Sequence, residues 1–224
     1  MLVVGYGRLG QLMAHVFQTQ PAPVFNRTRK HVDEASNAVY VGPEDFAKHH
    51  TVFLALPPTA YESFFQTYGP YFAEETMFFH MATACNVEEA AAIASPFSVV
   101  PLKLAGHAET SLQADEAVFA LPAAYQMYQA EVKSALNERA VVVEAEESDV
   151  REGNMAVTKA VILMMRQLEK TLEEEGVANE LHRGILRTIP SGVAAAYMEN
   201  KLGGFARKII EEEDRKQGSD NDAT

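Results

Sequence analysis

Three glycines near the start of the chain constrain its fold more than any other feature. The segment Gly5-Tyr-Gly7-Arg-Leu-Gly10 directly follows the apolar run Leu2-Val-Val4 and opens a stretch with the apolar spacing of a helix. Between a strand and a helix, this spacing permits a tight turn, a close approach of the backbone to a pyrophosphate, and close packing of helix on strand. We therefore predict a dinucleotide-binding loop of the Rossmann type. Its predicted binding residues are Gly5, Tyr6, Gly7, Arg8, Leu9 and Gly10.

The end of the second predicted strand indicates which dinucleotide binds. Rossmann proteins that bind NAD place an acidic residue about 20 residues after the glycine loop, where it accepts a hydrogen bond from the ribose 2′-hydroxyl. Here the strand ends in Asn26-Arg27-Thr28, and the first acidic residue of the chain is Asp33. Arg27 offers a planar fork to a 2′-phosphate and Thr28 a hydroxyl, while Arg29 and Lys30 add positive charge. These residues predict NADP(H) as the cofactor; the alternative is a basic turn that faces solvent.

Two further predicted strands end in turns that belong to the same edge of the sheet. One strand runs into Leu56 and Pro57, and the next runs into Ala82 and Thr83. Ligands of doubly wound folds bind at the carboxyl ends of the strands. We therefore expect these four residues to contact the cofactor, with Leu56 and Pro57 covering its ribose and diphosphate. An ordinary rigid turn at the proline is the alternative.

The pattern along the chain predicts an α/β fold, with a doubly wound Rossmann domain and a smaller all-helical C-terminal domain. Strands are expected near residues 2–4, 23–26, 38–41, 51–56, 76–82, 97–101, 116–121 and 139–145, all in one parallel sheet. Helices are expected between them at 9–18, 61–68, 87–94 and 122–136. Three further helices are expected at about 149–175, 178–200 and 202–216, with breaks at Gly176 and at Gly203-Gly204. The expected domains are 1–148 for NADP binding and 149–217 for dimerisation and substrate binding, followed by a disordered tail at 218–224.

Composition and charge narrow the classes of partner. A net charge of −12, from 31 acidic and 19 basic residues, argues against nucleic acid and anionic membranes. The single cysteine, Cys85, rules out an internal disulfide framework, and the N-terminus shows no basic signal-peptide segment. The adjacent His49 and His50 lack the spacing of metal ligands. We expect a cytoplasmic protein without a metal, which acts on a small molecule.

Taken in order, the motifs resemble those of a known family. The stretches Gly-Tyr-Gly-Arg-Leu-Gly, Phe-Asn-Arg-Thr and Phe-Leu-Ala-Leu-Pro-Pro look like the pyrroline-5-carboxylate reductases, and the related 6-phosphogluconate and β-hydroxyacid dehydrogenases share much of this order. Residues 175–195 are similar to the helical dimerisation region of the reductases. Where those reductases carry a substrate-binding Ser-Gly-Ser-Gly-Pro-Ala-Tyr-like stretch, this chain has Glu152-Gly-Asn-Met-Ala-Val-Thr158. The resemblance implies an NADP(H)-dependent oxidoreductase with divergent substrate motifs. The apolar residues of the helices expected at 149–175 and 178–200 predict a homodimer, because one subunit can rarely bury that much surface alone.

Proton donors are the least defined part of the expected site. Lys159 lies six residues after Gly153, which resembles the Gly-x-Gly-x-x-x-Lys pattern of the β-hydroxyacid dehydrogenases, whose lysine acts as general acid/base. The asparagines that follow that lysine in the family are absent here. His107 follows a strand near the expected cleft. With Lys103 and Thr83 these are the four candidates; the alternative is a protein that senses NADP(H) without turnover.

Overall fold

The computed structural model describes residues 1–221, which divide after Val157 into two compact units. This division falls later in the chain than the predicted boundary at residue 148. The reason is that the start of helix α7 (Glu147–Glu174) packs on the first unit. There Val150 is buried, and the Asn154 side chain donates a hydrogen bond to the carbonyl oxygen of Leu104 at 3.0 Å.

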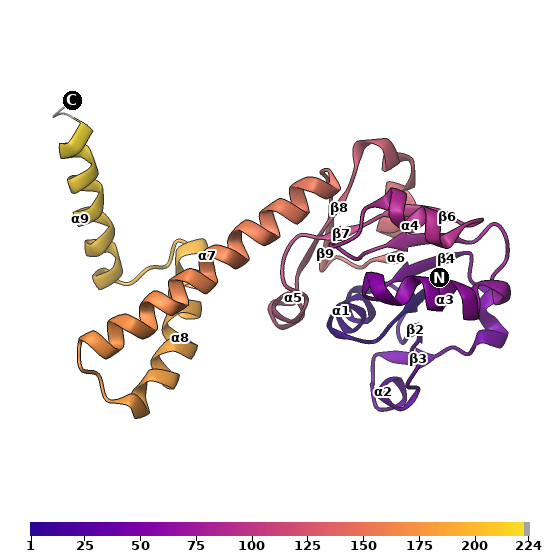
Figure 1. Cartoon of the computed structure of the whole chain (residues 1–224), viewed down its shortest axis with the longest axis horizontal. Helices are drawn as coiled ribbons and strands as arrows, with labels where there is room; N and C mark the ends of the chain where they lie inside the picture. The colour runs from indigo at the N-terminus through magenta and orange to yellow at the C-terminus, as the bar shows by residue number, and fades with distance from the viewer. Residues whose placement is uncertain (222–224) are drawn as a thin grey trace. The chain divides into compact units, whose positions relative to one another are not determined.

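The first unit is built on a sheet of six parallel strands (Figure 1). Their order, β3-β2-β1-β4-β5-β6, is that of the doubly wound dinucleotide-binding fold. The strands are β1 (Leu2–Val4), β2 (Ala22–Phe25), β3 (Ala38–Tyr40), β4 (Thr51–Leu54), β5 (Met77–His80) and β6 (Ser98–Pro101). The sequence predicts all six to within a few residues, because each is a short apolar run between turn residues. The predicted fold class is confirmed.

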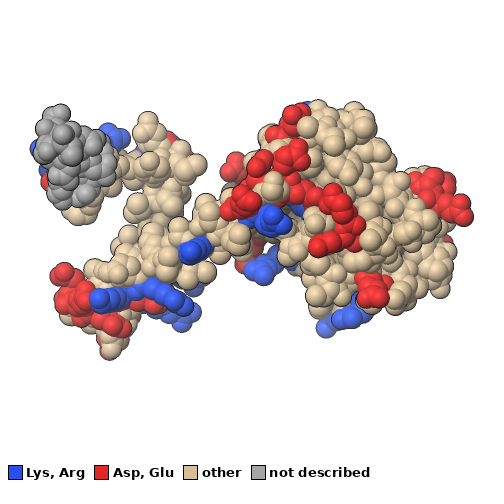
Figure 2. All heavy atoms as spheres, turned by 45° about the horizontal axis from the view of Figure 1, so that its top comes forward, with Lys and Arg blue, Asp and Glu red and all other residues tan. Residues whose placement is uncertain are grey.

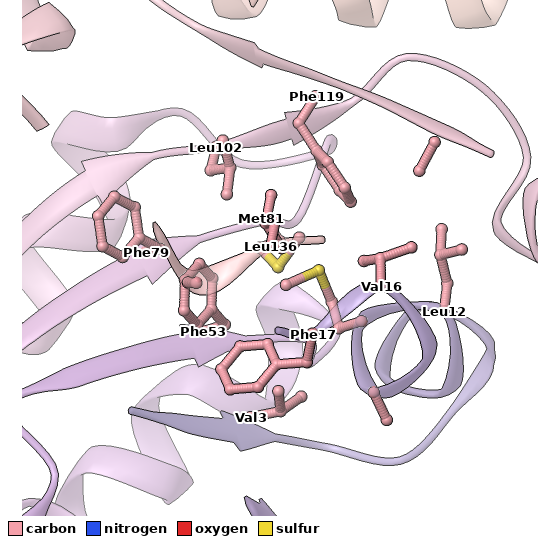
Figure 3. Packing of buried hydrophobic residues seen from close by; sticks show 14 of the residues in the cluster. Val3, Leu12, Val16, Phe17, Phe53, Phe79, Met81, Leu102, Phe119 and Leu136 are labelled. Carbon is pink, nitrogen blue, oxygen red and sulfur yellow. The ribbon is translucent and has the colours of Figure 1, made fainter. Parts of the chain in front are cut away.

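Both faces of this sheet are buried, as its near-continuous apolar strands require. On one face Val3, Phe53 and Phe79 lie side by side on β1, β4 and β5, and the rings of Phe53 and Phe79 stack at 5.0 Å between centroids. Figure 3 shows Phe17 of this cluster beside Phe53. On the other face Leu2, Val4 and Phe78 belong to a second cluster. The sheet is therefore a rigid platform for the loops at its carboxyl edge.

The helices of the first unit contribute buried side chains to the two hydrophobic clusters, one on each face of the sheet. They are α1 (Arg8–Val16), α2 (Lys30–Asp33), α3 (Tyr61–Tyr68), α4 (Val87–Ala94), α5 (Ala108–Ala114) and α6 (Gln129–Ala135), with 3₁₀ turns η1 (Pro43–Lys48), η2 (Pro58–Ala60), η3 (Gly69–Tyr71) and η4 (Ala123–Tyr128). The one helix predicted over 122–136 is thus a 3₁₀ turn followed by α6. Helices α2 and α5 were not predicted, since each is too short for a clear helical period.

The prediction of a single parallel sheet up to residue 148 is wrong. Strands β7 (Lys103–Leu104), β8 (Ala117–Leu121) and β9 (Ala140–Glu144) form a separate sheet, in which β7 is antiparallel to β8 and β8 is parallel to β9. Its inner face contributes Phe119 to the cluster on α1 and the large sheet (Figure 3). A local apolar pattern identifies a strand but not its neighbours, and β7, with two residues, has no pattern of its own.

The second unit is helical, as predicted. It contains the greater part of α7, then α8 (Asn179–Met198) and α9 (Gly204–Asn221). Gly176 follows the end of the first of these helices and has a φ of +65°, a backbone conformation that glycine adopts without strain. Helix α9 includes the first residues of the predicted disordered tail, and residues 222–224 lie outside the described part of the chain.

Two surface properties of the chain are its acidic charge and the hydropathy of its helices. Figure 2 shows acidic side chains in clusters on the Rossmann unit, as the net charge of −12 leads us to expect. In the described part of the chain, no helix is both long enough and apolar enough to cross a membrane.

Candidate functional site

The glycine loop between β1 and α1 is packed as tightly as its sequence predicts. Gly5 has a φ of +98°, and a Cβ atom placed on it would lie 2.5 Å from the carbonyl oxygen of Ala55. A Cβ atom on Gly10 would lie 2.0 Å from the carbonyl oxygen of Gly5. A Cβ atom on Gly7 would meet nothing within 4 Å. Two of the three glycines therefore allow α1 to pack on the strands, and the third faces open space.

Helix α1 presents an uncapped N-terminus at this open space. It begins at Arg8, its N-cap residue Gly7 makes no side-chain capping hydrogen bond, and its first turn contains no acidic residue. The first backbone N–H groups of a helix lack partners within the helix and carry a partial positive charge. This end of α1 can therefore bind an anionic group such as a diphosphate.

Asn26 joins the glycine loop to the loop after β2. The backbone N–H of Tyr6 donates a hydrogen bond to Asn26 Oδ1 at 3.1 Å, and Asn26 Nδ2 donates one to the carbonyl oxygen of Thr28 at 3.0 Å. The hydroxyl of Tyr6 in turn donates to Asn37 Oδ1 at 3.1 Å. Sequence reasoning placed Asn26 at the site as a cofactor ligand but missed that it holds the two loops together.

The basic residues after β2 are not equivalent. Arg29 forms an ion pair with Asp33 at 2.9 Å and lies over the ring of Tyr40, at 4.9 Å from its centroid. Lys30 lies 3.6 Å from a carboxylate oxygen of Glu34. Arg27 is exposed and pairs with no carboxylate among the described residues. Of the three, Arg27 is therefore the cation free to bind an anionic ligand.

Two adjoining cavities lie at the carboxyl edge of the sheet, and they share Leu56 and Pro57 as wall residues. The first, of about 380 Å³, lies between the ends of β1, β2 and β4 and helix α3. Its other wall residues include Gly5, Asn26, Arg27, Ser63, Phe64 and Tyr68. The second, of about 390 Å³, includes Gly7, Arg8, Leu9, Thr83, Leu104 and His107. Sequence analysis missed the α3 side chains, for which the only signal was a helix beginning just after the Pro57-Pro58 turn.

The structure brings two of the four candidate proton donors together. His107 and Thr83 line the second cavity, and His107 Nδ1 lies 3.1 Å from the hydroxyl of Thr110. Lys103 is 1% exposed and its amino group is engaged inside the protein. Lys159 is exposed and belongs to the helical unit. Ala82 is also buried and is not a wall residue of either cavity.

A buried polar cluster lies behind the second cavity, and nothing in the sequence indicated it. Lys103 Nζ contacts His80 Nε2 and lies 2.9 Å from Glu147 Oε1, an ion pair without the angles of a regular hydrogen bond. His80 Nδ1 lies 2.8 Å from the hydroxyl of Tyr61. Burial, with the nearby ammonium of Lys103, lowers the pKa of His80 to about 4. His80 is therefore neutral at pH 7 and can accept a hydrogen bond from Lys103.

Burial also shifts the pKa values of the groups around His80. It lowers the pKa of Lys103, while the Glu147 carboxylate opposes that shift. It raises the pKa of the Tyr61 hydroxyl, which stays neutral at pH 7. A buried charge needs a partner, and Glu147 supplies one for Lys103.

The strand order, the glycine loop and the two cavities together define a Rossmann-type protein with a helical C-terminal unit. No protein-family model matches the sequence, and no curated protein matches it at a significant level.

Solved structures do share the fold over nearly the whole chain. A pyrroline-5-carboxylate reductase from Coxiella burnetii matches with a TM-score of 0.66 at 13% identity, covering 98% of this chain and 90% of that one. The pyrroline carboxylate reductase of Plasmodium falciparum with NADP bound matches with a TM-score of 0.58 at 14% identity, covering 98% and 92%. An imine reductase from Streptomyces aurantiacus matches with a TM-score of 0.59 at 16% identity, covering 94% and 77%. The family resemblance seen in the motifs is thus confirmed at the level of the fold.

Proposed function

We propose that the chain is an NADP(H)-dependent oxidoreductase that acts on a small molecule. The observation that carries this proposal is the pair of adjoining cavities beside the glycine loop, with Arg27 in one and His107 and Thr83 in the other. A nicotinamide dinucleotide has an adenosine half and a nicotinamide half, joined by a diphosphate, and each half can occupy one of the two cavities. When bound, the cofactor supplies hydride chemistry, and the protein supplies binding, orientation and a proton.

The adenosine half fits the first cavity. Arg27 and Thr28 bind the 2′-phosphate through charge-assisted hydrogen bonds, and Asn26 keeps their loop in place. The free N–H groups at the start of α1 bind the diphosphate. Leu56 and Pro57 cover the ribose and diphosphate. The related structure from Plasmodium falciparum, which has NADP bound, supports this cofactor.

The nicotinamide half fits the second cavity, beside Thr83 and the turn that begins at Ala82. A reductase of this type must give a proton to its substrate, and histidine is the side chain that most often serves as a general acid. His107 can supply that proton from the cavity wall. Lys159 is the alternative donor, because its spacing from Gly153 resembles that of the lysine in the β-hydroxyacid dehydrogenases.

Residues 149–217, most of which belong to the helical unit, serve dimerisation and substrate binding in this proposal. Between residues 158 and 212, no side chain is buried among those whose exposure is described. Helices that are apolar on one face require a partner to cover it. A second copy of the chain, in the cytoplasm, is the partner that we propose.

The experiment is NADPH oxidation across a panel of cyclic imines, 2-oxo acids and short aldehydes. We expect steady turnover on at least one class. The structural likeness to pyrroline carboxylate reductases and imine reductases makes cyclic imines the first class to test. NADPH binding without turnover on any class would instead favour a sensor of NADP(H), whereas the absence of NADPH binding would exclude both functions.

A further inference from the structure

The loop that follows β5 carries Thr83 into the second cavity, and the buried side chain of Lys103 binds both of its ends from inside the protein. Lys103 Nζ donates hydrogen bonds to the carbonyl oxygens of Ala82, at 2.6 Å, and Cys85, at 3.1 Å. These two carbonyls stand on either side of Thr83 and Ala84. Lys103 therefore fixes both ends of the segment that forms part of the cavity wall.

The amino group of Lys103 is itself held in place by Glu147, the first residue of α7. Glu147 Oε1 lies 2.9 Å from Lys103 Nζ, and Glu147 Oε2 accepts a hydrogen bond at 3.0 Å from the backbone N–H of Val87, at the start of α4. One carboxylate thus joins the lysine to the helix that follows the Thr83 loop. His80, which is fully buried, packs against the same amino group.

This arrangement differs from that of a proton donor. Lys103 is 1% exposed and is not a wall residue of the cavity, although its neighbour Leu104 is. Its ammonium contacts His80 and two backbone carbonyls and forms an ion pair with Glu147, which leaves none of its three hydrogens free for a substrate. A buried ion pair of this kind can specify one conformation of the segments that it joins.

We propose that Lys103 and Glu147 are positioning residues, which hold the Ala82–Cys85 loop in the conformation that receives the nicotinamide half of the cofactor. This inference rests on the proposed function. Removing the ammonium leaves the buried carbonyl of Ala82 without its donor, and the carbonyl of Cys85 keeps only His80 Nε2, at 2.9 Å, as a neighbour, so the loop must move to satisfy Ala82. The first cavity, which contains Arg27, shares no side chain with this cluster.

The test compares two ligands, NADPH and adenosine 2′,5′-bisphosphate, in binding titrations. The bisphosphate reports on the first cavity alone, and NADPH on both. In Lys103→Met we expect NADPH affinity to fall at least about tenfold, as for the loss of one or two hydrogen bonds to a charged group. The affinity for the bisphosphate should change less than about twofold. Lys133→Met, at an exposed lysine on α6, is the matched control and should leave both affinities unchanged.

Glu147→Gln is the second variant, because Lys103→Met could fail to fold. It keeps an oxygen for Val87 and removes only the charge that faces Lys103, so NADPH affinity should fall at least about threefold, again without an effect on the bisphosphate. Equal loss of both ligands, or no loss of NADPH binding, would overturn the positioning role while leaving the proposed function intact. A wild-type protein that binds neither ligand would overturn the proposed function and this inference with it.

Discussion

The backbone N–H of Tyr6 donates a hydrogen bond to Asn26 Oδ1 at 3.1 Å, which joins the glycine loop to the loop after β2. The same side chain donates to the carbonyl oxygen of Thr28, which places Arg27 between two anchored residues. This matters for affinity, since a binding group that is already in place loses less entropy when a ligand arrives.

Cofactor choice should depend on Arg27 and not on its basic neighbour Arg29. Arg27→Ala should weaken NADPH binding about 10-fold to 100-fold, because one or two charge-assisted hydrogen bonds to the 2′-phosphate are lost. NADH binding should change little. Arg29→Ala is the control, since Arg29 is already paired with Asp33. The affinities for NADPH and NADH are measured in each variant by titration, with the fluorescence of the bound nicotinamide as the signal. Equal affinities of the wild-type protein for NADPH and NADH would show that the basic turn faces solvent.

A carboxylate introduced at the end of β2 should remove the preference for NADPH over NADH. Asn26→Asp combined with Arg27→Ala keeps an oxygen for the N–H of Tyr6 and can accept from the 2′-hydroxyl of NADH, while it repels a 2′-phosphate. We expect NADPH to lose its advantage in the same titration. In the wild-type protein, added salt should reduce the difference in affinity between NADPH and NADH, because salt screens the attraction between exposed charges.

Two glycines of the loop should respond differently to alanine. Gly10→Ala would place a Cβ atom 2.0 Å from the carbonyl oxygen of Gly5, so the free energy of unfolding should fall by about 3 kcal/mol, the upper part of the range for overpacking. Gly7→Ala meets nothing within 4 Å and should keep its stability but bind NADPH more weakly, because the new methyl enters the open space. Urea unfolding and NADPH titration separate the two effects. Equal stabilities would contradict the packing argument.

Stability should depend on pH through His80. Its pKa is about 4 in the folded protein and 6.5 when exposed, so between these values the unfolded chain binds a proton that the folded chain does not. The free energy of unfolding should therefore fall as the pH drops from 6.5 to 4, by about 3 kcal/mol from this group. His80→Gln should flatten that slope. Denaturant unfolding across this pH range is the measurement, and parallel slopes in wild type and His80→Gln would count against the assignment.

The general acid/base can be located by substitution at Lys159. If it gives the proton, Lys159→Met should lower turnover about 10²-fold to 10⁴-fold and leave NADPH affinity nearly unchanged. Lys170→Met, on the same helix, is the control, because Lys170 pairs with Glu174. Unchanged turnover in Lys159→Met, with a loss in His107→Gln, would exclude Lys159 and support His107 as the donor.

The oligomeric state follows from the apolar faces of α7 and α8. Val161 and Met164 on α7, and Leu181 and Ile189 on α8, are each more than two-fifths exposed. We expect light scattering to give about twice the chain mass of 24.6 kDa, and Val161→Glu with Ile189→Glu to give the monomer. A wild-type monomer at micromolar concentration would exclude the dimer.

Local sequence patterns suffice to predict several parts of this protein. The six strands of the large sheet, the loop from Gly5 to Gly10 and the helical character of the C-terminal part all follow from short-range patterns, because turn residues and apolar periods act within a few residues. Asn26 and Arg27 could be placed at the site for the same reason, as their distance along the chain from Gly5 is set by one βαβ unit.

Contacts between residues that are distant in the sequence depend on the folded chain. The tertiary structure placed β7 to β9 in their own sheet and buried Lys103 among His80, Glu147 and the carbonyls of Ala82 and Cys85. The local pattern shows Lys103 as a lysine after a strand, which favours an exposed side chain. Its burial depends on partners from β5 and α7, which are far away in the sequence. Contacts of this kind arise from the packing of whole elements, and no local signal encodes them.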